Sequence, residues 1–150
     1  MKQAIALAID SVALHGGGPF GAVVVKDNRV IATGINLVTA SNDPTAHAEV
    51  VAIRAACKAL QVYQLNGCEI YCSCEPCPMC LGAIYWSRLA RVYFSATRQD
   101  AADASFDDSF IYNELPLAPN ERSIPGVRVA AEEGLRPFVA WSNTTKRVPY

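Results

Sequence analysis

The sequence has 150 residues, of which 51% are hydrophobic and 18% charged, so residues 1–150 can form a single domain with a buried core. Its formal net charge of −1 gives no overall basic field for a nucleic-acid backbone, so no nucleic-acid partner is expected. Its apolar stretches are too short to cross a bilayer, and no membrane association is expected either.

The first part of the chain predicts a helix followed by a β-hairpin. Apolar residues recur at helical spacing over residues 2–14, and three glycines and a proline end the pattern. Residues 20–26 and 29–36 are rich in β-branched side chains. Asp27 and Asn28 lie between these two segments and are typical of a two-residue hairpin turn.

The middle of the chain predicts a polar loop and then a second helix. The loop covers residues 39–45 and ends with Asp43, Pro44 and Thr45. Asp followed by Pro is typical of a helix N-cap and first helical position, so the second helix is expected over about 44–60.

The rest of the chain alternates strands and helices. The pattern predicts a strand over 68–73, a helix from Pro76 or Pro78 to about 87, and a strand over 90–96. Beyond these the signals are weaker, and they indicate a short helix near 98–104, a loop through 120, a strand near 127–131 and a C-terminal helix over about 133–146.

This order of elements predicts the fold class. A hairpin joined to strands that alternate with helices is typical of an α/β protein whose sheet has both parallel and antiparallel pairs. The expected architecture is therefore a three-layer α/β/α sandwich with a mixed central sheet.

Cysteine usage points to a metal site. The chain has six cysteines, and four of them lie between residues 72 and 80, too close together for a disulfide framework. A metal site in a reducing cytoplasm fits better. An iron–sulfur run beginning at Cys74 would need a further cysteine where Ile84 stands. The cysteines expected to be buried, small hydrophobic residues are Cys57, Cys68, Cys72 and Cys74.

Cys77 and Cys80 differ because they lie three residues apart at the predicted start of a helix. That spacing places both sulfurs on one face, and the helix N-terminus favours the thiolate form that zinc binds. His47 opens another predicted helix and is the candidate third ligand. Glu49 is in the same first turn and can approach the same ion.

Three protein ligands leave one tetrahedral position for water or hydroxide, which is typical of a catalytic zinc. Zinc lowers the pKa of bound water from about 15.7 to roughly 7. Glu49 is then expected to act as a general acid/base. As a fourth ligand, Glu49 would instead close the site and make it structural, so the alternative of a zinc-binding module without chemistry stays open.

These motifs resemble a known family. His47-Ala48-Glu49 and Pro76-Cys77-Pro78-Met79-Cys80 follow the H-x-E and P-C-x-x-C signature of the zinc-dependent deaminases. The segments that resemble the short bacterial guanine deaminases are GGPFGAVVVKD, NDPTAHAEV, SCEPCPMCLGAIYWSR, FDDSFIY and the terminal Tyr150. The resemblance implies a cytidine-deaminase-like fold, one zinc ion per chain and hydrolysis of guanine to xanthine and ammonia in purine metabolism.

The resemblance also implies residues that bind the purine. Phe20 stacks on the ring, the Asn36 amide meets its polar edge, the Ala48 backbone N–H donates to it, and Trp86 walls the pocket. Asp108 accepts from the N–H groups that distinguish guanine from adenine, and it is implied to carry a proton to the departing ammonia.

Ordinary structural roles compete with each assignment. Phe20 could belong to the core, Asn36 could form a turn, Trp86 could be a buried structural residue, and Asp107 with Asp108 could be a solvated pair.

The C-terminal segment, about 133–150, is implied to close the pocket, with Tyr150 lining it. The resemblance implies a homodimer, and the segment can be exchanged between its subunits. A tRNA adenosine deaminase, or another nucleobase or nucleoside deaminase, shares the zinc motif and is the alternative activity. Such an RNA-binding enzyme would be expected to carry a basic face, which this sequence does not predict.

Overall fold

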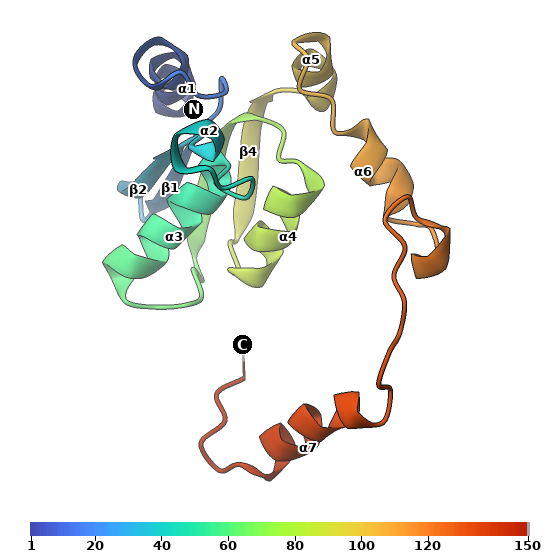
Figure 1. Ribbon diagram of the computed structural model, residues 1–150. Helices are drawn as coiled ribbons and strands as arrows, with labels where there is room; N and C mark the ends of the chain where they lie inside the picture. The colour runs from blue at the N-terminus through green and yellow to red at the C-terminus, as the bar shows by residue number, and fades with distance from the viewer. Residues whose placement is uncertain (150) are drawn as a thin grey trace. The chain divides into compact units, whose positions relative to one another are not determined.

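The central feature of the computed structural model, which describes residues 1–149, is a four-stranded sheet (Figure 1). Its strands are β1 (Gly21–Lys26), β2 (Arg29–Ile35), β3 (Cys68–Cys74) and β4 (Arg91–Ala96), in the order β2-β1-β3-β4. β1 pairs antiparallel with β2 and β3, whereas β3 and β4 are parallel. The prediction of a mixed sheet is confirmed.

The hairpin between β1 and β2 has the predicted two-residue turn. Asp27 and Asn28 have φ angles of 48° and 60°, and Lys26 pairs with Arg29 across the turn. Two successive residues with positive φ form the turn whose twist matches that of paired strands, and Asp and Asn tolerate this conformation well.

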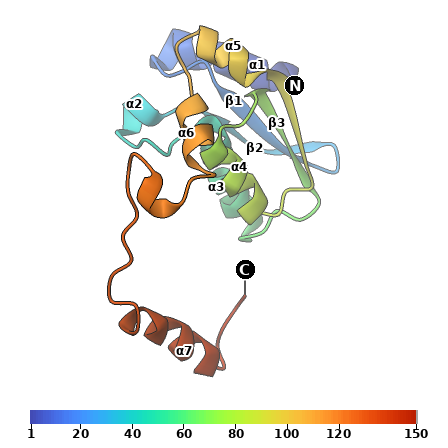
Figure 2. The ribbon, with the colours of Figure 1, turned by 90° about the vertical axis from the view of Figure 1, so that its right-hand side faces the viewer.

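Helices cover both faces of the sheet (Figures 1 and 2). A Cβ added to Gly21 would collide with the backbone of α1 (Lys2–His15), and one added to Gly34 would collide with the backbone of α3 (Ala48–Leu60). Gly34 pairs with Ala22, the neighbour of Gly21, so the two glycines lie on opposite faces of the sheet. α4 (Pro78–Trp86) packs against α3. With α1 on one face and α3 on the other, the three-layer prediction is confirmed.

The main core lies between the sheet and α3. Its fully buried members include Val24, Ile70, Leu65 and Ala52. This packing fixes α3 against β1 and β2, and it thereby fixes the N-terminus of α3 at the edge of the core, where His47 caps the helix.

Two local predictions before α3 are wrong. Residues 38–41 form the short helix α2 (Val38–Ser41) rather than part of a loop. The helix expected from 44 begins at Ala48. The Asp43 carboxylate instead accepts hydrogen bonds from the backbone N–H and the hydroxyl of Thr45, at 2.8 and 2.6 Å, so it closes a turn of its own.

The chain divides into two compact units, residues 1–108 and 109–150, and the second is described by itself. It contains α6 (Ser109–Glu114), which occupies part of the predicted loop, two short 3₁₀ turns (Pro119–Glu121 and Glu133–Leu135) and α7 (Arg136–Asn143). The expected C-terminal helix is therefore present but shorter. The described residues of this unit are all exposed or half-buried.

The strand predicted near 127–131 is wrong. Val127 and Val129 are 79% and 78% exposed, and the segment pairs with none of the described strands. A β-branched run forms a strand only where another strand offers hydrogen bonds, and the described part of this unit contains none.

Two further features bear on the expected environment. No helix within residues 1–149 has the length and apolar character needed to cross a membrane. All six cysteines are free thiols, and four of them are buried: Cys68, Cys72, Cys74 and Cys80. The predicted burial of Cys68, Cys72 and Cys74 is confirmed, whereas Cys57 is only half-buried.

Candidate metal centre and active site

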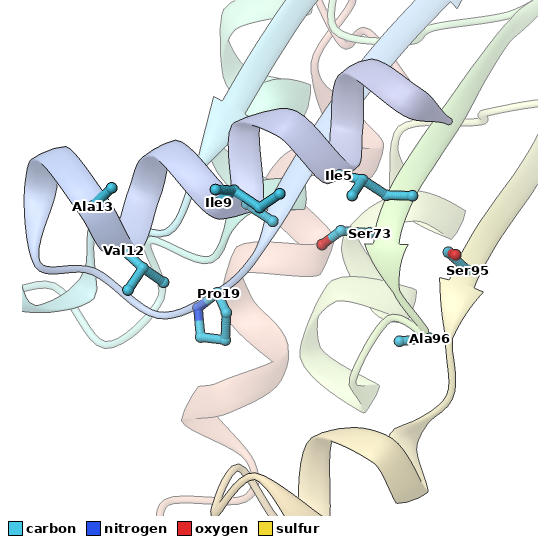
Figure 3. A pocket seen from close by; sticks show the side chains of 9 residues that line it. Ile5, Ile9, Val12, Ala13, Pro19, Ser73, Ser95 and Ala96 are labelled. Atoms are coloured by element: carbon cyan, nitrogen blue, oxygen red, sulfur yellow. The ribbon is translucent and has the colours of Figure 1, made fainter.

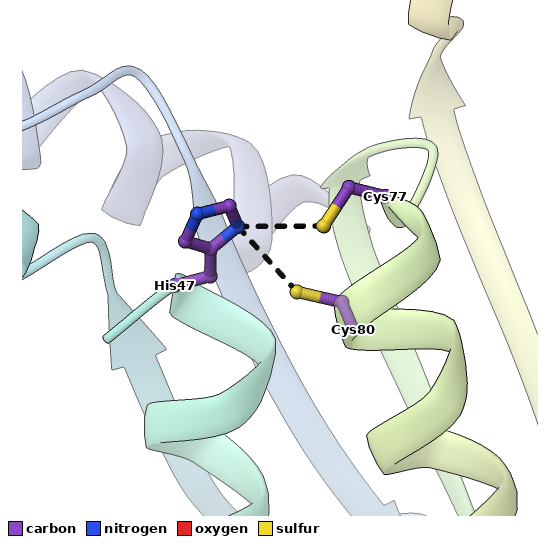
Figure 4. A group of neighbouring side chains, drawn as sticks. All are labelled: His47, Cys77 and Cys80. Carbon is purple, nitrogen blue, oxygen red and sulfur yellow. Dashed lines mark hydrogen bonds between the residues drawn. The ribbon is translucent and has the colours of Figure 1, made fainter. Parts of the chain in front are cut away.

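Two helix N-termini bring the predicted ligands together (Figure 4). His47 is the N-cap of α3, and Cys77 is the N-cap of α4, with Cys80 in the first turn after it. Pro78 occupies the first helical position, so the second of the two predicted helix starts is the correct one. The Nδ1 atom of His47 lies 3.6 Å from the sulfur of Cys77 and 3.6 Å from that of Cys80.

These distances fit a tetrahedral zinc site. Bond lengths of about 2.3 Å to sulfur and about 2.05 Å to nitrogen, at a tetrahedral angle, separate the two donor atoms by about 3.6 Å. Imidazole nitrogen and thiolate sulfur are also the donors that zinc prefers. The residues present therefore match the ion in both chemistry and spacing.

The electrostatics of the cluster favour thiolate at Cys77. A hydrogen bond from the Cys80 thiol lowers the pKa of Cys77 to about 4, and the same bond, together with burial, raises the pKa of Cys80. A hydrogen bond to Cys77 raises the pKa of His47. A bound cation would displace the remaining thiol proton, because a ligating cysteine is deprotonated.

Glu49 lies beside the cluster. It is 7% exposed and stands in the first turn of α3, and its Oε2 atom lies 3.4 Å from the sulfur of Cys80. Burial raises the pKa of this carboxyl group. Among residues 1–149, the potential ligand atoms within 4.8 Å of one another belong to His47, Cys77 and Cys80, and Glu49 is not part of that group. Its role as a general acid/base rather than a fourth ligand stays a prediction.

Asp108 is placed near the metal cluster. Its side chain is half-buried, whereas Asp107 is exposed. Burial raises the pKa of Asp108, and the nearby Cys77 sulfur raises it further. The carboxylate in turn helps to raise the pKa of His47. The half-burial of Asp108 and its nearness to Cys77 and His47 agree with the prediction, and its role in the reaction stays a prediction.

Phe20 and Asn36 lie on adjacent chain segments, where the Asn36 backbone N–H donates to the Phe20 carbonyl at 3.3 Å. Asn36 is buried, and its Oδ1 atom accepts from the Val38 N–H at 3.2 Å, so it also forms the turn that was the alternative reading. Phe20 is half-buried and packs against the core, so it also serves in part as the core residue that was its alternative role.

Ala48 is fully buried and is the first residue of α3. The N–H groups of a first helical turn have no acceptor within the helix. The Ala48 N–H therefore has no acceptor within its own helix, and its role as a donor to the purine stays a prediction.

Of the two remaining predicted pocket residues, the structure describes only Trp86. Trp86 ends α4, whereas Cys77 caps its other end, and the indole is 63% exposed. The alternative of a buried structural Trp is therefore wrong, and its role as a pocket wall stays a prediction. Tyr150 lies outside the described residues.

A match to a known family decides the classification. Residues 1–96 match the zinc-binding region of the cytidine and deoxycytidylate deaminases. The chain belongs to this family. Over its full length it is 57% identical to the guanine deaminase of Bacillus subtilis, of which it covers 96%.

A solved structure and a second relative were also compared with the chain. The X-ray structure of Bacillus subtilis guanine deaminase superposes with a TM-score of 0.97 at 57% identity, over 99% of this chain and 95% of that one. Similarity to the tRNA-specific adenosine deaminase of Aquifex aeolicus is partial, at 47% identity over 54% of each chain. The cytidine-deaminase-like fold and the zinc cofactor are thus properties of this deaminase.

Sequence reasoning missed one aromatic neighbour of the predicted site. The ring of Phe106 meets that of Phe20 edge-on, with centroids 5.0 Å apart and an interplanar angle of 88°. The signal was the first Phe of the FDDSF segment, which stands two residues before Asp108. In this deaminase, Phe106 supports the ring predicted to stack on the substrate.

Proposed function

We propose that this protein is a zinc-dependent guanine deaminase that converts guanine and water to xanthine and ammonia. The observation that carries the proposal is the buried Glu49 carboxyl, 3.4 Å from a sulfur of the His47–Cys77–Cys80 cluster but outside the ligand group. Support for guanine comes from the likeness to a guanine deaminase over the full chain, against a likeness to a tRNA deaminase over about half of it.

His47, Cys77 and Cys80 would hold the zinc ion. When bound, zinc lowers the pKa of a coordinated water to about 7 and so supplies a nucleophile at neutral pH. The Glu49 carboxyl would accept the proton of the attacking water and deliver it to the substrate. Burial raises the pKa of this carboxyl group, which makes it a better proton acceptor than an exposed carboxylate.

The remaining site residues bind and orient the purine. Phe20, braced by Phe106, offers a ring face, and the Asn36 amide and the Ala48 N–H offer polar partners for its edge. Asp108 accepts from the N–H groups of guanine, which adenine does not present in the same pattern. We also assign to Asp108 the transfer of a proton to the departing ammonia.

A homodimer with exchange of residues 133–150 completes the proposal. The first unit has an apolar groove of about 580 Å³ beside α1, lined by Ile5, Ile9, Val12 and Pro19 among others (Figure 3). In the second unit, Phe138, Val139 and Trp141 of α7 are 69%, 58% and 45% exposed. Exposed apolar surfaces of this extent mark contact sites. The segment of a second copy would cover apolar surface of this kind, and its Tyr150 is proposed to line the pocket.

The cytoplasm is the proposed compartment. Its support is the state of the six cysteines, which are all free, as expected where thiols stay reduced.

A panel of candidate substrates tests the function. Guanine, adenosine, cytidine, cytosine and a tRNA anticodon hairpin would each be incubated with the enzyme, with and without a zinc chelator, and ammonia would be measured. Ammonia from guanine, lost with chelator and restored by zinc, is the expected result. Release from the hairpin alone would identify a tRNA deaminase, and release from none would indicate a structural zinc module.

A further inference from the structure

Glu75 connects the loop that carries Cys77 to the start of α5 (Arg98–Asp103). Its Oε2 atom accepts from the Arg98 backbone N–H at 3.0 Å, and its own N–H donates to the Ala96 carbonyl at 2.8 Å. Next to it, the Cys74 thiol donates to the Thr97 carbonyl at 3.4 Å. Three bonds thus join two segments that are more than twenty residues apart in the sequence.

Apolar packing holds α5 only weakly, because Ala101 and Ala102 are half-buried and its other residues are exposed. The helix has six residues and none of them is buried. A helix this short is not stable by itself, because its few internal hydrogen bonds do not offset the entropy lost in forming it. Its own capping box, between Thr97 and Asp100, stabilises the first turn through bonds within the helix itself. The hydrogen bonds around Glu75 therefore contribute to fixing where α5 lies.

The position of α5 determines where two site residues lie. The Phe106 N–H donates to the Ala101 carbonyl of α5 at 2.9 Å, and Phe106 braces Phe20. Asp108 follows two residues later, and its carboxylate lies close enough to Arg98 for that cation to act on its pKa.

We propose that Glu75 is a positioning residue. Its carboxylate, through the Arg98 N–H and α5, fixes the position of Asp108 relative to the loop that carries Cys77. This inference rests on the proposed function, because Asp108 is the residue through which Glu75 acts. Glu75 stands two residues before Cys77, so one loop places a metal ligand at one end and the substrate-recognition segment at the other.

A double-mutant cycle tests this link. In Glu75→Ala, kcat/KM for guanine is expected to fall on the order of tenfold, as for loss of a charge-assisted hydrogen bond. In the Asp108→Asn background the same change is expected to have less than about a twofold effect, because the residue it positions is already altered. Equal effects in both backgrounds would overturn the inference.

Two further variants separate positioning from general stability. Gln retains an oxygen that can accept from Arg98, so Glu75→Gln should keep kcat/KM within about threefold of the original enzyme. Glu69→Ala, on β3, removes a carboxylate that accepts from the Tyr71 hydroxyl and has no bond to α5, and it should leave kcat/KM unchanged. A loss in Glu75→Gln as large as in Glu75→Ala would overturn the inference.

Zinc content and amide hydrogen exchange give readouts that do not depend on activity. Glu75→Ala is expected to retain one zinc per chain and to exchange the Arg98 amide faster, with Glu69→Ala unchanged. Loss of zinc would mean that Glu75 acts on the metal loop instead, and unchanged exchange would mean that the bond does not hold α5. If the unaltered enzyme released no ammonia from guanine, the proposed function would fail, whereas the exchange result would still report on the link to α5.

Discussion

Glu49 and Cys80 lie on different helices and come within hydrogen-bonding distance because each stands in a first helical turn. If His47 and Glu49 stood in the middle of a helix, two residues apart, their side chains would point in nearly opposite directions. At the N-cap His47 has an extended backbone, with φ −67° and ψ 156°, and this change of direction lets both side chains approach the α4 terminus. The chemistry of the site thus depends on where α3 begins.

The Glu49→Ala variant is predicted to lose turnover while keeping zinc. Positioned acid/base groups contribute about 10²- to 10⁴-fold to rate, so kcat should fall by that order. Zinc content, measured by mass spectrometry of the purified protein, should stay at one ion per chain because the three ligands are intact. Glu49→Gln is the matched control for side-chain volume and should be equally slow. A rate within tenfold of the original enzyme would identify another base.

At the scale of the element, the close contact between β2 and α3 determines how far the N-terminus of α3 lies from the sheet. Gly34 faces Ala48 and Ala52, and the absence of a Cβ lets the helix backbone approach the strand. Because Ala48 follows His47, any displacement of α3 at this point moves the metal ligand as well.

Gly34→Ala and Gly82→Ala are predicted to have opposite effects on the free energy of unfolding. The methyl group on Gly34 would collide with the α3 backbone, and such overpacking lowers stability by about 1–3 kcal/mol. Gly82 lies within α4 with no atom near the added methyl, and alanine there should raise stability by about 0.5–1 kcal/mol. Urea unfolding measures both. Equal effects would mean that the contact does not constrain α3.

At the scale of the whole molecule, the two units differ in how they are stabilised. The first has a sheet with buried side chains on both faces, whereas the described residues of the second expose Ile124, Val127 and Val129 at 78% or more. Apolar residues at such exposure favour burial against another surface. This difference is the physical basis for expecting a second copy.

Removal of residues 146–150 is predicted to reduce kcat/KM for guanine while leaving zinc content unchanged, because the tail is proposed to close the pocket and not to hold the metal. Tyr150→Phe, which keeps the ring, is the control and should retain most of the activity. Full turnover by the truncated enzyme would exclude a closing role for the tail.

Mixed dimers distinguish exchange from closure within one chain. A Glu49→Ala chain supplies an intact tail, and a chain lacking 146–150 supplies an intact Glu49. If tails are exchanged, the mixture should recover one working site per mixed dimer, measured as ammonia release after refolding the two chains together. No recovery would place each tail over its own subunit's site.

The sequence by itself determined the elements and the motif whose signals are local. The hairpin follows from two residues that tolerate positive φ, and the paired cysteines follow from a three-residue spacing at a helix start with Pro78. Such features depend on neighbours along the chain, so a pattern of a few residues is enough to predict them.

Only the tertiary structure decided how distant segments meet. His47 and Cys77 are thirty positions apart, and Glu75 and Arg98 twenty-three; their contacts follow from the strand order β2-β1-β3-β4 and not from any local spacing. The same reason explains the error at 127–131, because strand propensity is expressed only where a neighbouring strand supplies partners. Local propensity selects what a segment can become, and the contacts available to it decide what it does become.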